Sequence, residues 1–198
     1  MAKRRKVSNP LALAVMAELT AEPMHPYEMG RRLKEHGKDR NIKYNRSSLY
    51  MVVEQLRKAG FVAEQETVRD TQRPERTVYA LTPEGKAELD DWMREWIAEP
   101  QVEYPAFGVA LCLLVVVPTA EAVDLLGRRL AALDARIDET RGQLHKAAGM
   151  AVHPMFVIED EYELALLRAE RSFTENLIAQ LGDPEFNRTL QDFMRSLE

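Results

Sequence analysis

The sequence predicts a mainly α-helical protein with one small pair of β-strands. Three observations support this fold class. Apolar residues recur every three or four positions through most of the chain, alternation with a period of two is confined to residues 61–81, and an apolar heptad begins at Val123. With 198 residues, of which 45% are hydrophobic, the chain is long and apolar enough for one domain or two small ones with buried cores.

Three short helices are expected in the first half. The first covers residues 11–19, and the second begins at Pro26, where the missing N–H costs nothing, and ends at about Gly37. The third covers residues 45–60 and is terminated by Gly60. Its apolar stripe consists of Leu49, Val52, Val53 and Leu56. One side of this helix would therefore pack on the domain, and the other would be free to enter a DNA groove, as a recognition helix requires.

A β-hairpin is expected directly after the third helix. Residues 61–67 and 77–81 have the composition of short strands. The polar tip between them, residues 68–76, carries three arginines, and Thr82 is placed to cap a fourth helix. The order helix, helix, helix, strand, strand, helix predicts a winged helix-turn-helix domain over residues 9–98, with the hairpin as its wing.

Four motifs in this region resemble the PadR family of bacterial transcriptional regulators. They are Pro23–Met29, Ser48–Tyr50, Leu56–Phe61 and Arg76–Gly85. Their order and spacing match over residues 9–97. The resemblance implies a winged helix-turn-helix fold, an obligate dimer, pseudo-palindromic operators and repression that a small molecule relieves.

One residue departs from the family pattern. Met51 follows the tyrosine where family members often have proline.

The second half predicts a helical dimerisation domain over residues 107–182, joined by a linker at residues 99–106. The apolar block 107–117 is expected to form a buried helix, and residues 183–198 a helical or frayed tail. Two long amphipathic helices, one from Val123 and one over 155–181, are too narrow to form a domain alone, so we expect coiled-coil-like packing across a two-fold axis. The residues expected to mediate dimerisation are Val123, Leu126, Leu130, Leu133, Ile137, Leu144, Leu166, Phe173 and Leu177. The resemblance identifies this region as the dimerisation domain of two-domain PadR members.

Charge divides the chain at about the same place. The formal net charge is −5, but residues 1–86 hold 17 basic and 11 acidic side chains, whereas residues 87–198 hold 10 basic and 21 acidic ones. The basic half indicates nucleic acid as a partner. The basic N-terminal arm, residues 1–8, would either lie along the minor groove or remain a solvated tail.

The expected DNA-contacting residues follow from charge and position. At the start of the third helix, we expect contacts to phosphates or base edges from Ser47, Ser48 and Tyr50. The DNA backbone would be anchored by Lys43 and Arg46. The wing would enter or line the minor groove with Arg69, Arg73 and Arg76. Two alternatives remain open: the wing arginines are only solvated, or Tyr50 packs under its helix.

An effector site is the least defined expectation. Trp92 and Trp96 lie one turn apart on the fourth helix and form either core or the wall of a flat ligand site. The favoured position for a small aromatic or hydrophobic effector is between this pair and two residues of the apolar block, Phe107 and Leu111. Such a ligand would change operator affinity by binding two states of the dimer differently.

Other classes of function find little support. No phosphate loop or nucleophile elbow is present, so neither enzyme activity nor a cofactor is expected. The four histidines are scattered, so no metal site is expected, and the single cysteine, Cys112, suits a reducing cytoplasm. Cys112 is expected to be a small buried hydrophobe, with a redox sensor as the alternative. No apolar stretch is long enough to span a membrane.

The sequence therefore predicts a cytoplasmic, homodimeric, sequence-specific DNA-binding regulator, most simply a repressor. The alternative is a winged-helix module that uses its basic face to bind an acidic protein without specific DNA binding.

Overall fold

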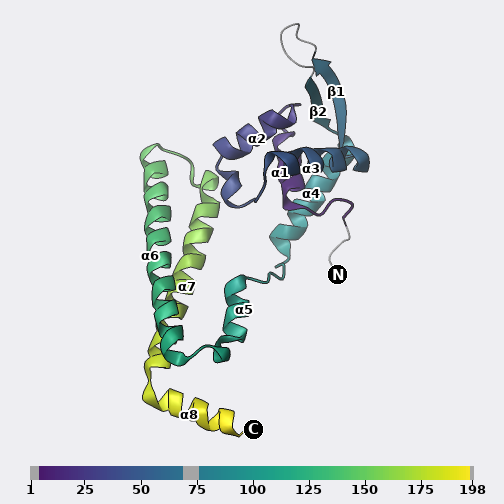
Figure 1. Cartoon of the computed structure of the whole chain (residues 1–198). Helices are drawn as coiled ribbons and strands as arrows, with labels where there is room; N and C mark the ends of the chain where they lie inside the picture. Colours follow the sequence, from purple (N-terminus) through teal and green to yellow (C-terminus); the bar gives the residue numbers. More distant parts are fainter. Residues whose placement is uncertain (1–4, 69–75, 197–198) are drawn as a thin grey trace. The chain divides into compact units, whose positions relative to one another are not determined.

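The computed structural model describes residues 5–68 and 76–196 (Figure 1). The chain forms two compact units, Met1–Val102 and Glu103–Glu198. Each is described here by itself.

The N-terminal unit begins with the three expected helices. Their bounds are α1 (Pro10–Glu18), α2 (Pro26–Glu35) and α3 (Arg46–Ala59), with a short 3-10 turn η1 (Lys38–Arg40) before α3. Each helix start is capped by a side chain: Asn9, His25 and Asn45 each accept a hydrogen bond from a backbone N–H of the first turn. Prolines occupy the first position of α1 and α2, which explains why these short helices begin where they do.

The two strands form an antiparallel hairpin. β1 (Val62–Val68) pairs with β2 (Arg76–Leu81), with an irregular register between Glu64 and Glu66. Met24, in the loop between α1 and α2, adds a bridge to Tyr79, with N–O distances of 3.0 and 3.1 Å in the two directions. The base of the hairpin is thus attached to the helix-turn-helix by backbone hydrogen bonds.

Helix α4 (Pro83–Ala98) follows the hairpin and is tied to it at one point. The Thr82 hydroxyl accepts a hydrogen bond from the Gly85 N–H and donates to the Gly60 carbonyl, at 3.0 and 2.8 Å. The Thr82 N–H donates to the Phe61 carbonyl at 3.0 Å. Gly85 is required here, because a Cβ at this position would lie 2.0 Å from the Phe61 carbonyl oxygen.

One hydrophobic core holds this unit together. It is built from α1, α2, α3, α4 and residues near the hairpin base, and it includes the whole predicted α3 stripe. Its largest fully buried side chains are Trp92, Leu11, Met16, Met29, Leu33 and Leu56.

The C-terminal unit is a long antiparallel α-hairpin with short flanking helices (Figure 1). Its elements are α5 (Ala106–Cys112), η2 (Leu114–Val116), α6 (Thr119–Gly149), η3 (Pro154–Phe156), α7 (Ile158–Gly182) and α8 (Pro184–Arg195). Two small cores form along α6 and α7. One contains Leu133, Ile137, Leu164 and Leu167, and the other contains Ala122, Leu126 and Leu181. Helix α8 covers most of residues 183–198, so the expected tail is mostly helical.

Two expectations for this unit are wrong. The apolar block 107–117 forms two short helices rather than one, and none of their residues is fully buried. Cys112 is exposed instead of buried. A segment that is apolar on every face needs neighbours on every face, and this chain alone does not supply them.

No helix among the described residues is both long and apolar enough to cross a membrane. Within residues 5–68 and 76–196, no three His, Cys, Asp or Glu residues gather as a metal site would require.

Candidate nucleic-acid interface

The exposed face of α3 is held in a fixed position by its two ends. At the start, Asn45 Oδ1 accepts from the Ser48 N–H at 2.8 Å, and Ser48 Oγ accepts from the Asn45 N–H at 2.9 Å. At the end, Gly60 adopts a φ of 82°, which other residues avoid, and terminates the helix. Because Leu49, Val52, Val53 and Leu56 are buried, the opposite face of α3 points to solvent.

Three predicted DNA contacts lie exposed at the start of α3 or just before it. Lys43, Arg46 and Ser47 are all exposed. Tyr50 is 36% exposed and packs edge-on against His25, with 6.0 Å between the ring centroids. The Arg46 guanidinium lies 5.8 Å from the centroid of the Tyr50 ring. Tyr50 therefore keeps one side in solvent and does not pack under its helix.

Ser48 differs from these residues. Its hydroxyl is used in the helix cap, where it also donates to the Asn45 carbonyl at 2.9 Å. A contact from Ser48 to DNA would compete with the hydrogen bonds that start α3.

The wing arginines are only partly described. Arg69 and Arg73 lie outside the described residues, and Arg76 is the first residue of β2. Their predicted role in the minor groove stays a prediction.

The exposed face of α3 also carries an acidic residue. Glu54 accepts two hydrogen bonds from Arg57, at 2.7 and 2.9 Å, and pairs with Lys58 at 3.5 Å. The hydrogen bonds from Arg57 lower the pKa of Glu54 to about 2, so the carboxylate is charged at neutral pH. Its charge is offset by two neighbouring cations on the same helix, which reduces the repulsion a phosphate would meet.

Arg5 does not behave as part of a free basic arm. Its side chain is 4% exposed and bonds to Glu88 and Asp91 of α4 at 2.7 and 3.2 Å, and to Glu95. Its guanidinium also lies 5.1 Å from the Trp92 ring centroid. Burial opposes the charge, but the hydrogen bonds to the two glutamates outweigh it and raise the pKa of Arg5. Arg5 is thus neither solvated nor available to DNA, and no local pattern in the sequence predicts this.

The four predicted effector residues belong to different units. Trp92 is buried in the core, and Trp96 is 39% exposed with its ring edge-on to Trp92 at 5.4 Å. In the C-terminal unit Phe107 contacts Phe173, and the Arg129 guanidinium lies 3.6 Å from its ring centroid. Leu111 is partly exposed.

The predicted dimerisation residues divide into three groups by burial. Leu126, Leu133 and Ile137 are buried in the chain's own hairpin, whereas Val123, Leu130, Leu144 and Leu177 are only partly buried. Leu166 and Phe173, on α7, are 52% and 49% exposed. The α6 heptad is therefore largely used within the chain, and Leu166 and Phe173 are the predicted residues that stay about half exposed.

Comparison with known proteins agrees with this architecture. Residues 15–91 match the "Transcriptional regulator PadR-like family". The "Negative transcriptional regulator PadR" of Bacillus subtilis (strain 168) is 26% identical over 179 residues, which are 86% of this chain and 97% of that protein.

Solved structures share the fold across both units. Bacillus subtilis PadR in complex with operator DNA aligns with a TM-score of 0.69 and 22% identity, covering 86% of this chain and 98% of that one. The same protein in complex with p-coumaric acid aligns with a TM-score of 0.68 and 21% identity, covering 87% and 99%. A PadR-like regulator of Bacillus cereus aligns with a TM-score of 0.60 and 16% identity, covering 90% and 99%.

The family match covers the helix-turn-helix, the hairpin and most of α4, and the fold agreement extends through the helical unit behind them. Residues 15–91 therefore match the PadR-like family of transcriptional regulators, and the chain shares the fold of the solved PadR structures over both units.

Proposed function

We propose that this protein is a homodimeric repressor that binds a pseudo-palindromic operator through α3 and the β1–β2 hairpin. The observation that carries the proposal is the rigid presentation of the exposed α3 face, with Lys43, Arg46 and Ser47 at its start and the hairpin beside it. A helix fixed in this way can lie in the major groove while basic residues hold the flanking phosphates. The solved complex of Bacillus subtilis PadR with operator DNA supports the same use of the fold.

Dimerisation is supported by an uncovered stripe on α7. Tyr162, Leu166 and Phe173 recur at near-helical spacing and are about half exposed or more, with Ile158 at the helix start also exposed. A stripe of this kind along a two-helix hairpin is best covered by a second copy related by a two-fold axis. The dimer would place the two α3 helices about 34–36 Å apart, one helical turn of DNA.

A small effector is the third part of the proposal. The relative from Bacillus subtilis has been solved with p-coumaric acid, a small aromatic acid. For this chain we propose an aromatic or hydrophobic ligand that contacts the exposed part of Trp96, whose ring stands edge-on to the buried Trp92. The ligand would weaken operator binding by stabilising the dimer state that fits the operator less well.

Electrophoretic mobility shift with the DNA upstream of the protein's own gene tests the DNA-binding proposal. The wild type should form a complex that excess non-specific DNA does not remove, and Arg46→Ala should weaken it by about 5-fold or more. Arg195→Ala, an exposed arginine at the end of α8, is the matched control and should bind as the wild type does. No specific complex at low salt would favour the protein-interaction module instead.

The place of action follows from the partner. A regulator of chromosomal DNA acts in the cytoplasm and is associated with the nucleoid when bound.

A further inference from the structure

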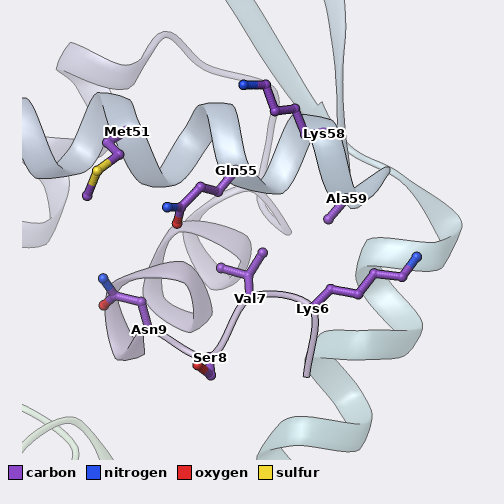
Figure 2. A pocket seen from close by; sticks show the side chains of 8 residues that line it. All are labelled: Lys6, Val7, Ser8, Asn9, Met51, Gln55, Lys58 and Ala59. Carbon is purple, nitrogen blue, oxygen red and sulfur yellow. The ribbon is translucent and has the colours of Figure 1, made fainter. Parts of the chain in front are cut away.

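A hollow with a volume of about 570 Å³ lies beside the exposed face of α3. We call it the α3 hollow. Its lining residues are Lys6, Val7, Ser8 and Asn9 from the segment before α1, and Met51, Gln55, Lys58 and Ala59 from α3 (Figure 2). Among the described residues, the hollow is lined by the end of the expected basic arm and by α3, and Lys6 is the charged residue that the arm contributes.

The lining is suited to an anion. It contains two lysines, three neutral polar side chains and no carboxylate. Within the part of the chain that the structure describes, no hydrogen bond engages the Ser8 hydroxyl or the Gln55 amide, and Asn9 uses only its Oδ1, as the α1 cap. The hollow thus offers N–H and O–H donors together with positive charge.

The two lysines come from the two sides of the hollow. In Figure 2, Lys6 lies below Ala59 and Lys58 above it with their ammonium groups directed apart, while Gln55 points from α3 toward residues 7–9. The Lys6 ammonium is 5.6 Å from the Phe61 ring centroid, and Lys58 makes one exposed pair with Glu54 at 3.5 Å. Both are long, flexible point charges whose present contacts are weak and exchangeable.

The position of the hollow indicates which anion it faces. Met51, Gln55 and Lys58 follow one another by four and three residues, away from the buried stripe of α3. They continue the surface that Ser47 begins near the helix start. A helix that lies in the major groove, which is about 12 Å wide, has a sugar-phosphate strand along its flank. The α3 hollow lies on such a flank.

We infer that the α3 hollow seats one backbone phosphate of the operator, held by Lys6 and Lys58 with Ser8 and Gln55 as hydrogen-bond donors. This inference rests on the proposed function, because it requires α3 to lie in the major groove. The contact supplies affinity and register but no base readout, since every nucleotide presents the same phosphate. It also gives the segment before α1 a role in DNA binding through Lys6, while Arg5 anchors that segment to α4.

The test is the salt dependence of DNA binding by the full chain. Lys6→Gln with Lys58→Gln should lower the slope of log K against log salt by about 0.9 per protomer, or about 1.8 per dimer. Affinity at about 0.1 M salt should fall at least about 5-fold, and by the same factor for operator and non-specific DNA. Lys86→Gln is the control: this lysine, on α4, is 66% exposed, pairs with Asp90 at 3.9 Å and lies outside the hollow.

Two further variants separate this inference from a loss of folding. Lys58→Arg keeps the charge and should bind as the wild type does. Gln55→Glu places a carboxylate in the hollow. It should weaken the binding of both operator and non-specific DNA more than Gln55→Ala does. Thermal unfolding of each variant is measured in parallel to confirm that the fold is intact.

The possible failures are distinguishable. If the wild type binds specifically but the double variant has an unchanged slope of log K against log salt, the α3 hollow does not bind a phosphate. The proposed function is unaffected by that result. A loss confined to operator DNA also overturns the phosphate contact, because the lysines would then read sequence. Absence of specific binding by the wild type contradicts the proposed function itself.

Discussion

The two units of this protein bury their apolar residues to different extents. The N-terminal unit gathers buried residues from all four of its α-helices into one core. The C-terminal unit has two small cores, and α5, η2 and one side of α7 remain exposed. The first unit covers its apolar side chains with its own chain. The second unit leaves apolar surface that another surface is needed to cover.

The largest expected change in the free energy of unfolding comes from comparing one glycine in each unit. Gly85→Ala should destabilise the N-terminal unit by at least about 3 kcal/mol, because the added methyl meets a backbone carbonyl that cannot move alone. Gly142→Ala, inside α6 with open space around it, should instead stabilise the chain by about 0.5–1 kcal/mol. Urea unfolding of both variants measures the difference. Equal effects would mean that the α4 contact with Phe61 is loose.

The second effect concerns the uncovered surface of α7. Leu133→Ala removes a side chain from the hairpin core and should cost about 2–5 kcal/mol of stability. Leu166→Ala should leave the thermal stability at high protein concentration nearly unchanged but raise the concentration at which dimers dissociate. Sedimentation equilibrium compares the two variants. If Leu166→Ala dissociates no more readily than the wild type, α7 is not the dimer surface.

A third, smaller effect tests the attachment of the N-terminal segment. Arg5→Gln leaves the largely buried Glu95 without its cation and should destabilise the first unit by about 2 kcal/mol. Lys34→Gln, an exposed change on α2, should have no measurable effect. Thermal unfolding of the two variants decides the matter, and identical melting temperatures would mean that Arg5 contributes nothing there.

The smallest effect is a pH dependence. The pKa of Glu54 is lowered to about 2, so the stabilisation from its pair with Arg57 is fully present above the ordinary carboxyl pKa of 4.5 and disappears as the pH falls toward 2. Because the pair is exposed, the contribution is small and salt-sensitive. Unfolding of Glu54→Gln should therefore differ from the wild type at pH 6 and converge with it near pH 2. A constant difference across that range would contradict the assignment.

Local signals made the N-terminal fold predictable. Pro26, Gly60 and Thr82 each act through their immediate neighbours, so the sequence located the helix boundaries within a residue or two. The face of α3 that carries Arg46 and Ser47 was predictable for the same reason.

Contacts between distant residues were not predictable in this way. Arg5 meets Glu88 and Glu95 across more than 80 residues, and Met24 pairs with Tyr79, with no local pattern to announce either contact. The α3 hollow has no local signal, because its two sides, residues 6–9 and residues 51–59, come together only in the folded chain. Cys112 is exposed against expectation, because an apolar neighbourhood in sequence does not guarantee a covering neighbour in space.

The junction at Phe61 has a consequence for how regulation can work. Its N–H donates to the Leu56 carbonyl at the end of α3, and its carbonyl receives the Thr82 N–H at the start of α4, while β1 begins at the next residue. The end of α3, the start of β1 and the start of α4 are therefore joined through one residue. In the proposed dimer, a displacement of α4 would change the distance between the two α3 helices without altering the exposed face of either. An effector that acted in this way would change the occupancy of the operator and leave the preferred half-site the same.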